Sequence, residues 1–224
     1  MLVQQRLHEE NDVSDLGKST QYRLTAAKPA RDRDGRKHRA QRSQMLIVNA
    51  MLELVARGNL EPSADQIAEI ADVGRRSVFR HFSDMDTLYR EMNNSIAASM
   101  ESIAQQPFQA ADWRGQLLEL VDRRAVVFEK LKPFLLALQV HRHRSAFLKT
   151  SHTRFVGLLR NILMGIFPKD AARDVVLVET LDMLLSFASW SRLREDQELS
   201  VAKSKHVLKQ AIELLLEGRA REEM

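Results

Sequence analysis

Apolar residues recur through most of this chain at intervals of three and four positions, the spacing that gathers them on one face of an α-helix. The stretch 145–166 is the clearest case, because its leucines, isoleucines and phenylalanines share one wide face. Runs in which apolar and polar residues alternate, the pattern of half-buried strands, are absent from the sequence. Together these patterns predict an all-α protein.

Local signals divide the pattern into separate helices. Ser63 and Gln66 have the capping-box spacing of a helix N-terminus, whereas Pro107 and Pro168 predict breaks. The predicted helices cover 41–57, Ser63 to about 71, two turns after Gly74, 85–105, 113–131, a short element after Pro133, 145–166, 170–194 and 200–217.

Residues 1–40 show no helical stripe, and we predict a flexible basic N-terminal extension there. Its end overlaps the segment 31–42, which carries six lysines and arginines against two aspartates. Two interpretations stay open for this segment: a solvated tail that leads into the first helix, or an arm that lies along DNA phosphates or enters a minor groove. The overall charge of +4 decides little between them.

The segment 63–88 has the composition of a helix-turn-helix, and with its neighbours it predicts a DNA-binding domain over 41–92. The residues that can brace its two short helices are apolar: Ile67, Ala68, Val73, Val78 and Phe82. The second helix carries three arginines and no acid. Arginine can read guanine through two hydrogen bonds, whereas phosphate contacts position a protein without reading sequence. The predicted DNA contacts are Arg75, Arg76, Ser77, Phe79, Arg80, His81 and Ser63. The alternative is an ordinary exposed helix with solvated arginines.

Residues 41–92 resemble the N-terminal domain of the TetR family of bacterial repressors. The likeness rests on Ile67-Ala68, the turn Asp72-Val73-Gly74, the run from Ser77 to Phe82, and the run from Met85 to Leu88. The chain departs from the family's pattern where Asp72 stands for a glycine, Gly74 for a serine cap, Phe79 for a tyrosine and Met85 for a lysine. The last two changes remove polar phosphate contacts, and we expect the arginines and the basic arm to compensate.

The resemblance implies that residues 93–224 form a helical domain that dimerises and binds a small molecule. The dimer surface is expected on the last two long helices, at Leu185, Trp190, Leu193, Val207, Leu208, Ala211 and Leu215. The predicted ligand-binding residues are Phe134, Leu138, His141, Phe155, Leu159, Met183 and Phe187. Both sets also fit a plain hydrophobic core. A basic cluster that could form a rim for an anionic ligand consists of His141, Arg142, His143, Arg144 and His152.

Several functional classes are not expected. The chain has no cysteine, which excludes disulfides, thiolate metal sites and cysteine nucleophiles. It has no glycine-rich phosphate loop, His-Glu-x-x-His motif or nucleophile elbow, and we expect neither an enzyme nor a bound metal or cofactor. Without an apolar run of about 18 residues or a signal-peptide core, we expect a cytoplasmic protein that does not enter a membrane.

The leading hypothesis is a homodimeric transcriptional regulator, a repressor, that binds a palindromic operator in double-stranded DNA and is released by a small-molecule ligand. One alternative is a DNA-bound scaffold of the same fold that recruits a protein partner and takes no inducer. Another is a helical enzyme or chaperone with an incidental basic helix. A sealed, well-packed second domain would favour the scaffold, and an absence of salt-dependent DNA binding would favour the third class.

Overall fold

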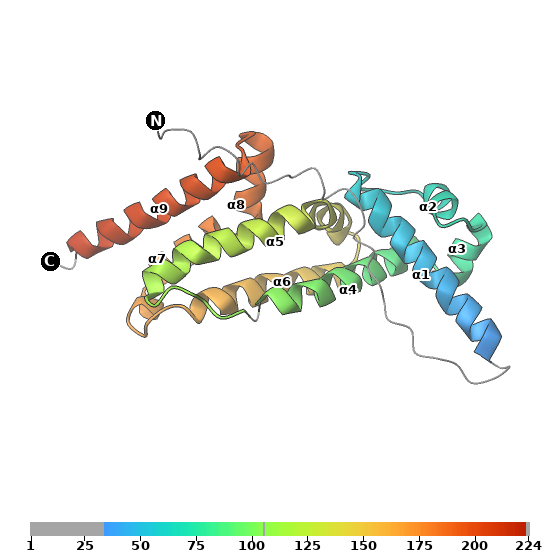
Figure 1. Ribbon diagram of the computed structural model, residues 1–224, viewed down its shortest axis with the longest axis horizontal. Helices are drawn as coiled ribbons and strands as arrows, with labels where there is room; N and C mark the ends of the chain where they lie inside the picture. The colour runs from blue at the N-terminus through green and yellow to red at the C-terminus, as the bar shows by residue number, and fades with distance from the viewer. Residues whose placement is uncertain (1–33, 105, 223–224) are drawn as a thin grey trace, which may run out of the picture. The chain divides into compact units, whose positions relative to one another are not determined.

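The computed structural model describes residues 34–104 and 106–222 of the chain (Figure 1). Every element of regular structure within these ranges is helical, which confirms the predicted all-α class. By its internal contacts the chain falls into two units, Met1–His38 and Arg39–Met224, and all the packing described below lies within the second. The part of the predicted flexible extension before residue 34 lies outside the described residues.

The first four helices form the predicted helix-turn-helix and its supports: α1 (Asp34–Ala56), α2 (Ala64–Ile70), α3 (Arg75–His81) and α4 (Met85–Ala104). The capping box at the start of α2 is confirmed, because the Gln66 N–H donates to the Ser63 hydroxyl at 3.3 Å and the Ser63 N–H donates to the Gln66 side chain at 2.9 Å. Apolar side chains from all four helices are buried together, among them Ile47, Met51, Val55, Ile67, Val78, Phe82, Leu88 and Met92.

The start and the inner face of α1 differ from the prediction. The helix begins at Asp34 and not near 41, because lysine, arginine and alanine favour a helix even without burial, and residues 37–40 are exposed. Helical spacing predicts a buried stripe of Met45, Val48, Leu52 and Val55. The structure instead buries Ile47 and Met51 fully and leaves Met45 40% exposed. Apolar residues spaced three and four apart occur on two neighbouring faces of this helix, and tertiary packing determines which face is buried. Helical spacing also predicts that Ile70 of α2 is buried with Ile67 and Ala68, but its side chain is 39% exposed.

The remaining helices pack around α5 (Trp113–Arg142), which contacts α4, α6, α8 and α9 (Figure 1). They are α6 (Ala146–Met164), η2 (Ala171–Arg173), α7 (Val175–Leu184), α8 (Phe187–Ser191), the π-helical turn η3 (Arg192–Asp196) and α9 (Val201–Glu222). None of the described helices is both long enough and apolar enough to cross a bilayer.

The predicted break at Pro133 is wrong, because α5 continues through it. A proline inside a helix costs about 3 kcal/mol. Leu131 and Phe134, on either side of Pro133, are both buried in the core. Burying such a side chain contributes about 1.5–3 kcal/mol, so the two together outweigh the local cost of the proline.

The single helix predicted over 170–194 is also wrong, because the chain breaks between α7 and α8. The carbonyl of Leu185 at the end of α7 accepts a 2.5 Å hydrogen bond from the guanidinium of Arg124. Ser186 then caps α8, and its hydroxyl accepts from the Ser189 N–H at 3.2 Å. The break therefore depends on a residue of α5 that lies far away in the sequence.

Candidate nucleic-acid interface and ligand cavity

A tight turn sets the angle between α2 and α3. Asp72 adopts a φ of +51°, in the left-handed region where glycine is the usual residue. The Val73 N–H donates to the carbonyl of Ala68 at 3.0 Å, which closes the end of α2. Val78 and Phe82 anchor α3 from below, since both are almost fully buried. The predicted bracing core is therefore present, with Val73 half-buried at its edge.

The outward face of α3 carries the arginines predicted to contact DNA. Arg75, Arg76 and Arg80 are all exposed. Arg75 pairs with Asp65 of α2 at 3.1 Å, and Arg80 donates to the Ser77 hydroxyl at 3.3 Å. Exposed ion pairs contribute only about 0–1 kcal/mol, so a phosphate or a base can replace Asp65 at little cost.

The other residues predicted to contact DNA differ in their exposure and in the hydrogen bonds that they already make. Phe79 is 42% exposed, with the Arg75 guanidinium 5.8 Å from its ring centre. Ser63 already uses its hydroxyl oxygen as the cap of α2, which leaves the hydroxyl proton free to donate. His81 is half-buried at the end of α3, and its buried Nε2 has no hydrogen-bond partner in the structure. Met85, which stands where a lysine was expected, packs against the core.

His141, predicted as a ligand-binding residue, instead lies against α4 and the loop before α2. Its ring stacks on Tyr89 of α4 with centroids 3.8 Å apart, and its Nε2 lies 3.7 Å from a carboxylate oxygen of Glu61. The Tyr89 hydroxyl donates to the carbonyl of Leu60 at 3.2 Å. Burial lowers the pKa of His141 below its ordinary value, against the opposing pull of Glu61. The end of α5 is thereby fastened to α4 and to the loop before α2.

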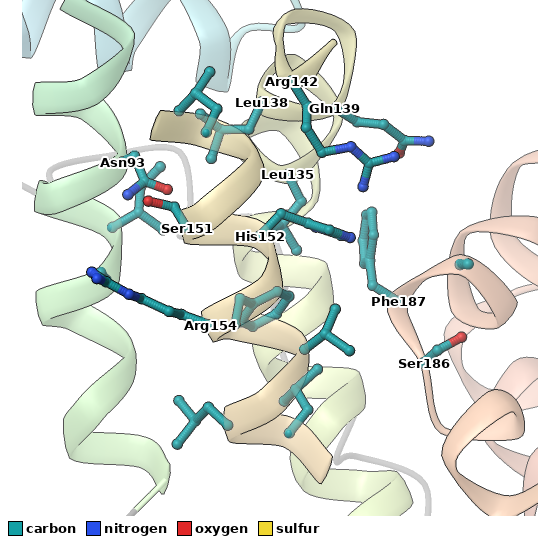
Figure 2. Close-up of a pocket in the computed structure, with 18 of the residues that line it drawn as sticks. Asn93, Leu135, Leu138, Gln139, Arg142, Ser151, His152, Arg154, Ser186 and Phe187 are labelled. Carbon is teal, nitrogen blue, oxygen red and sulfur yellow. The ribbon is translucent and has the colours of Figure 1, made fainter. Parts of the chain in front are cut away.

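A cavity of about 670 Å³ lies between α4, α5, α6 and α8 (Figure 2). Four predicted ligand-binding residues line it: Leu138, Phe155, Leu159 and Phe187. The other three do not: Phe134 is buried in the core, Met183 is exposed on α7, and His141 has the position just described. Arg142 and His152 of the predicted basic cluster also line the cavity.

Sequence reasoning missed Arg124, a charged residue at the wall of this cavity. Its side chain is 4% exposed, and it donates to the carbonyls of Leu185 and Leu159 at 2.5 and 2.6 Å. Burial lowers the pKa of Arg124 to about 10, while the charge of Asp182 opposes the shift, so the guanidinium stays protonated at neutral pH. The sequence does contain a sign of this role, because Arg124 lies among the apolar residues that form the buried face of α5.

The residues predicted at a dimer surface fall into two groups. Leu185, Trp190, Leu193 and Leu208 are buried within the protomer and present almost no surface to a partner. Trp190 also donates from its indole nitrogen to Glu129 at 2.8 Å, as expected for an interior residue. Val207 is exposed and Ala211 and Leu215 are half-buried. The exposed apolar residues that prediction missed here are Val175, Val176 and Met183 on α7 and Leu214 on α9.

No protein-family model matches this chain, and no curated protein matches it in sequence. Solved structures do share its fold. The transcriptional regulator FadR from Bacillus subtilis in complex with stearoyl-CoA is 12% identical, with a TM-score of 0.56 over 75% of this chain and 96% of that one. A TetR-like transcriptional regulator from Rhodococcus sp. RHA1 is 18% identical, with a TM-score of 0.54 over 84% of this chain and all of that one. The chain thus has the fold of TetR-like transcriptional regulators.

Proposed function

We propose that this chain, with the fold of TetR-like transcriptional regulators, binds a palindromic DNA operator as a homodimer and is released when a small molecule occupies its cavity. The observation that carries the DNA-binding part is the outward face of α3. It presents three exposed arginines and no acidic residue, on a helix held by the buried side chains of Val78 and Phe82. A helix of this kind fits a major groove, where arginine reads guanine and anchors to phosphate.

The cavity supports the proposal that a ligand releases the protein from DNA. Four residues of α4 line it, and α4 begins four residues after the last residue of α3. The ring stack of Tyr89 and His141 adds a second link between α4 and the end of α5. A ligand that binds one arrangement of α4 more tightly than another shifts the population toward that arrangement, and hence changes the spacing of two DNA-reading helices in a dimer.

The same cavity favours the proposal over a DNA-bound scaffold that recruits a protein. A scaffold needs no space for a small molecule in its helical body, and a volume of about 670 Å³ is in the range of ligand sites. The FadR structure, which shares the fold, contains stearoyl-CoA, so this fold accommodates a ligand in at least one protein.

The test is a selection from random DNA duplexes with the full chain, at two salt concentrations. We expect enrichment of a palindrome with half-sites about one helical turn apart, and an affinity that falls steeply as salt rises. A folded protein that enriches no sequence would contradict the proposal.

Single substitutions in α3 then separate base reading from phosphate contact. Arg75→Ala should weaken binding to the selected operator by about 1–3 kcal/mol and relax the preference at one position of each half-site. Arg80→Ala should weaken binding to all duplexes alike and reduce the salt dependence. Arg173→Ala, which removes an exposed charge from η2, is the matched control and should leave binding unchanged. If Arg75→Ala lowers the affinity for all operator variants equally, Arg75 does not read a base directly.

A further inference from the structure

The cavity carries an excess of positive charge. Its titratable lining consists of three arginines, at positions 124, 142 and 154, one histidine, His152, and one carboxylate, Asp182. The carboxylate of Asp182 is already engaged, because it accepts a 3.0 Å hydrogen bond from Arg160, which is not part of the lining. The cationic groups therefore lack matching negative charge within the cavity itself.

Two of the cationic groups lie together at one side of the cavity. Figure 2 shows the nitrogen-bearing ends of Arg142 and His152 on the side of α6 that faces Phe187. Burial and then the charge of Arg142 lower the pKa of His152 below its ordinary value. Within the described residues, no carboxylate forms an ion pair with Arg142. A negative group placed here would meet two hydrogen-bond donors and no competing acid.

The wall beside this pair is apolar. Leu135, Phe155 and Leu159 contribute to it from α5 and α6, and Phe187 contributes from α8. An edge-to-face contact with Phe128, with centroids 5.4 Å apart, fixes the Phe187 ring. Arg124 lies in the same wall with its charge buried and its Nε without a partner. A buried cation strengthens attraction for an anion and disfavours a second cation, because little water screens it.

We propose that the cavity binds an amphipathic organic carboxylate, whose apolar chain lies along Phe155 and Phe187 and whose carboxylate contacts Arg142 and His152. This inference rests on the proposed function, in which the same molecule is the ligand that releases DNA. Arg142 offers a fork of N–H donors that matches the two oxygens of a carboxylate. Binding also favours the protonated form of His152, because the carboxylate opposes the burial and the Arg142 charge that lower its pKa, so the protein should take up protons on binding.

The first experiment compares three molecules of equal chain length by titration calorimetry on the full chain, below their micellar concentrations. Decanoate should bind at least about tenfold more tightly than decan-1-ol, because a hydrogen bond to a charged group contributes roughly that much. Decyltrimethylammonium should bind more weakly than decan-1-ol. Equal affinity for decanoate and decan-1-ol, or a preference for the cation, would overturn the proposal.

The second experiment locates the carboxylate. Arg142→Gln should lower the affinity for decanoate about tenfold while affinity for decan-1-ol is kept, which shows that the apolar cavity remains intact. Arg144→Gln removes the same charge two residues away, outside the lining, and should leave both affinities unchanged. An equal loss of affinity for decanoate in both variants, or no loss of affinity in either, would place the carboxylate elsewhere and refute the assignment.

The failure of this inference is separable from failure of the proposed function, because ligand binding and DNA binding are measured independently. If the protein enriches a palindrome but does not prefer decanoate, the ligand class is wrong and the regulator remains. If decanoate binds with the expected charge preference but no palindrome is enriched, the cavity assignment holds and the DNA-binding role falls.

Discussion

Asp72 shows at the scale of one residue how the helix-turn-helix forms without the glycine usual at its turn. Its φ of +51° is in the left-handed region, which aspartate visits more readily than most residues. The same backbone angle excludes branched side chains, whose Cβ substituents clash with the backbone there. The turn therefore tolerates Asp72 but sharply restricts its replacement.

This restriction gives a prediction for stability. Asp72→Val should lower the free energy of unfolding by about 1–2 kcal/mol, the cost of forcing an ordinary residue into the left-handed region. Asp72→Gly should leave it unchanged or raise it, because glycine meets no such cost. Urea denaturation of the two variants measures the difference. A Val variant as stable as the Gly variant would mean that the backbone at this position relaxes to another conformation.

At the scale of elements, the junction of α4, α5 and the loop before α2 holds His141, which the sequence predicted as a ligand-binding residue but which does not line the cavity. His141 is in the last turn of α5. Its actual neighbours, Tyr89 and Glu61, come from α4 and from the loop before α2. No local pattern shows that α5 reaches this junction, since that depends on the helix continuing through Pro133.

The lowered pKa of His141 predicts how this junction responds to acid. In the unfolded chain the imidazole binds a proton near its ordinary pKa of 6.5, whereas the folded chain binds it only at lower pH. Below about pH 6.5 the unfolded state therefore holds more protons, and stability falls as pH falls toward the folded pKa. Glu61 and Asp86 oppose the shift, and Arg144 adds to it.

His141→Phe keeps a ring on Tyr89 but removes the titrating group. Its Tm should fall less than that of the unchanged protein between pH 7.5 and pH 5.5, because other groups contribute equally to both proteins. Thermal unfolding followed by circular dichroism across this range gives the comparison. Parallel Tm curves would show that His141 titrates alike in the folded and unfolded chains.

At the scale of the whole molecule, the exposed apolar residues of α7 and α9 mark the surface proposed for the dimer. Met183 is 61% exposed and Leu214 is 67% exposed, and α7 and α9 contact each other. Two DNA-reading helices can occupy successive major grooves only if two copies are related by a two-fold axis. A pair of adjacent helices with unpartnered apolar side chains suits such an axis.

Met183→Glu should therefore raise the dissociation constant of the dimer at least about tenfold, because burying one such side chain contributes about 1.5–3 kcal/mol. Val126→Glu is the matched control, since Val126 is 65% exposed on α5, outside α7 and α9. Sedimentation velocity over a range of concentrations measures both. A dimer weakened by Val126→Glu and not by Met183→Glu would place the interface on α5.

The sequence by itself determined what local chemistry controls. The all-α class, the capping box at Ser63, the turn at Asp72 and the arginines of α3 all follow from neighbouring residues, because capping, backbone angle and helical spacing act over one or two turns. Only the tertiary structure decided which face of α1 is buried, that α5 continues through Pro133, and that Arg124 bonds to the end of α7 and lines the cavity. Each of these depends on contacts between residues far apart in the chain, whose energies exceed local preferences and leave no local pattern.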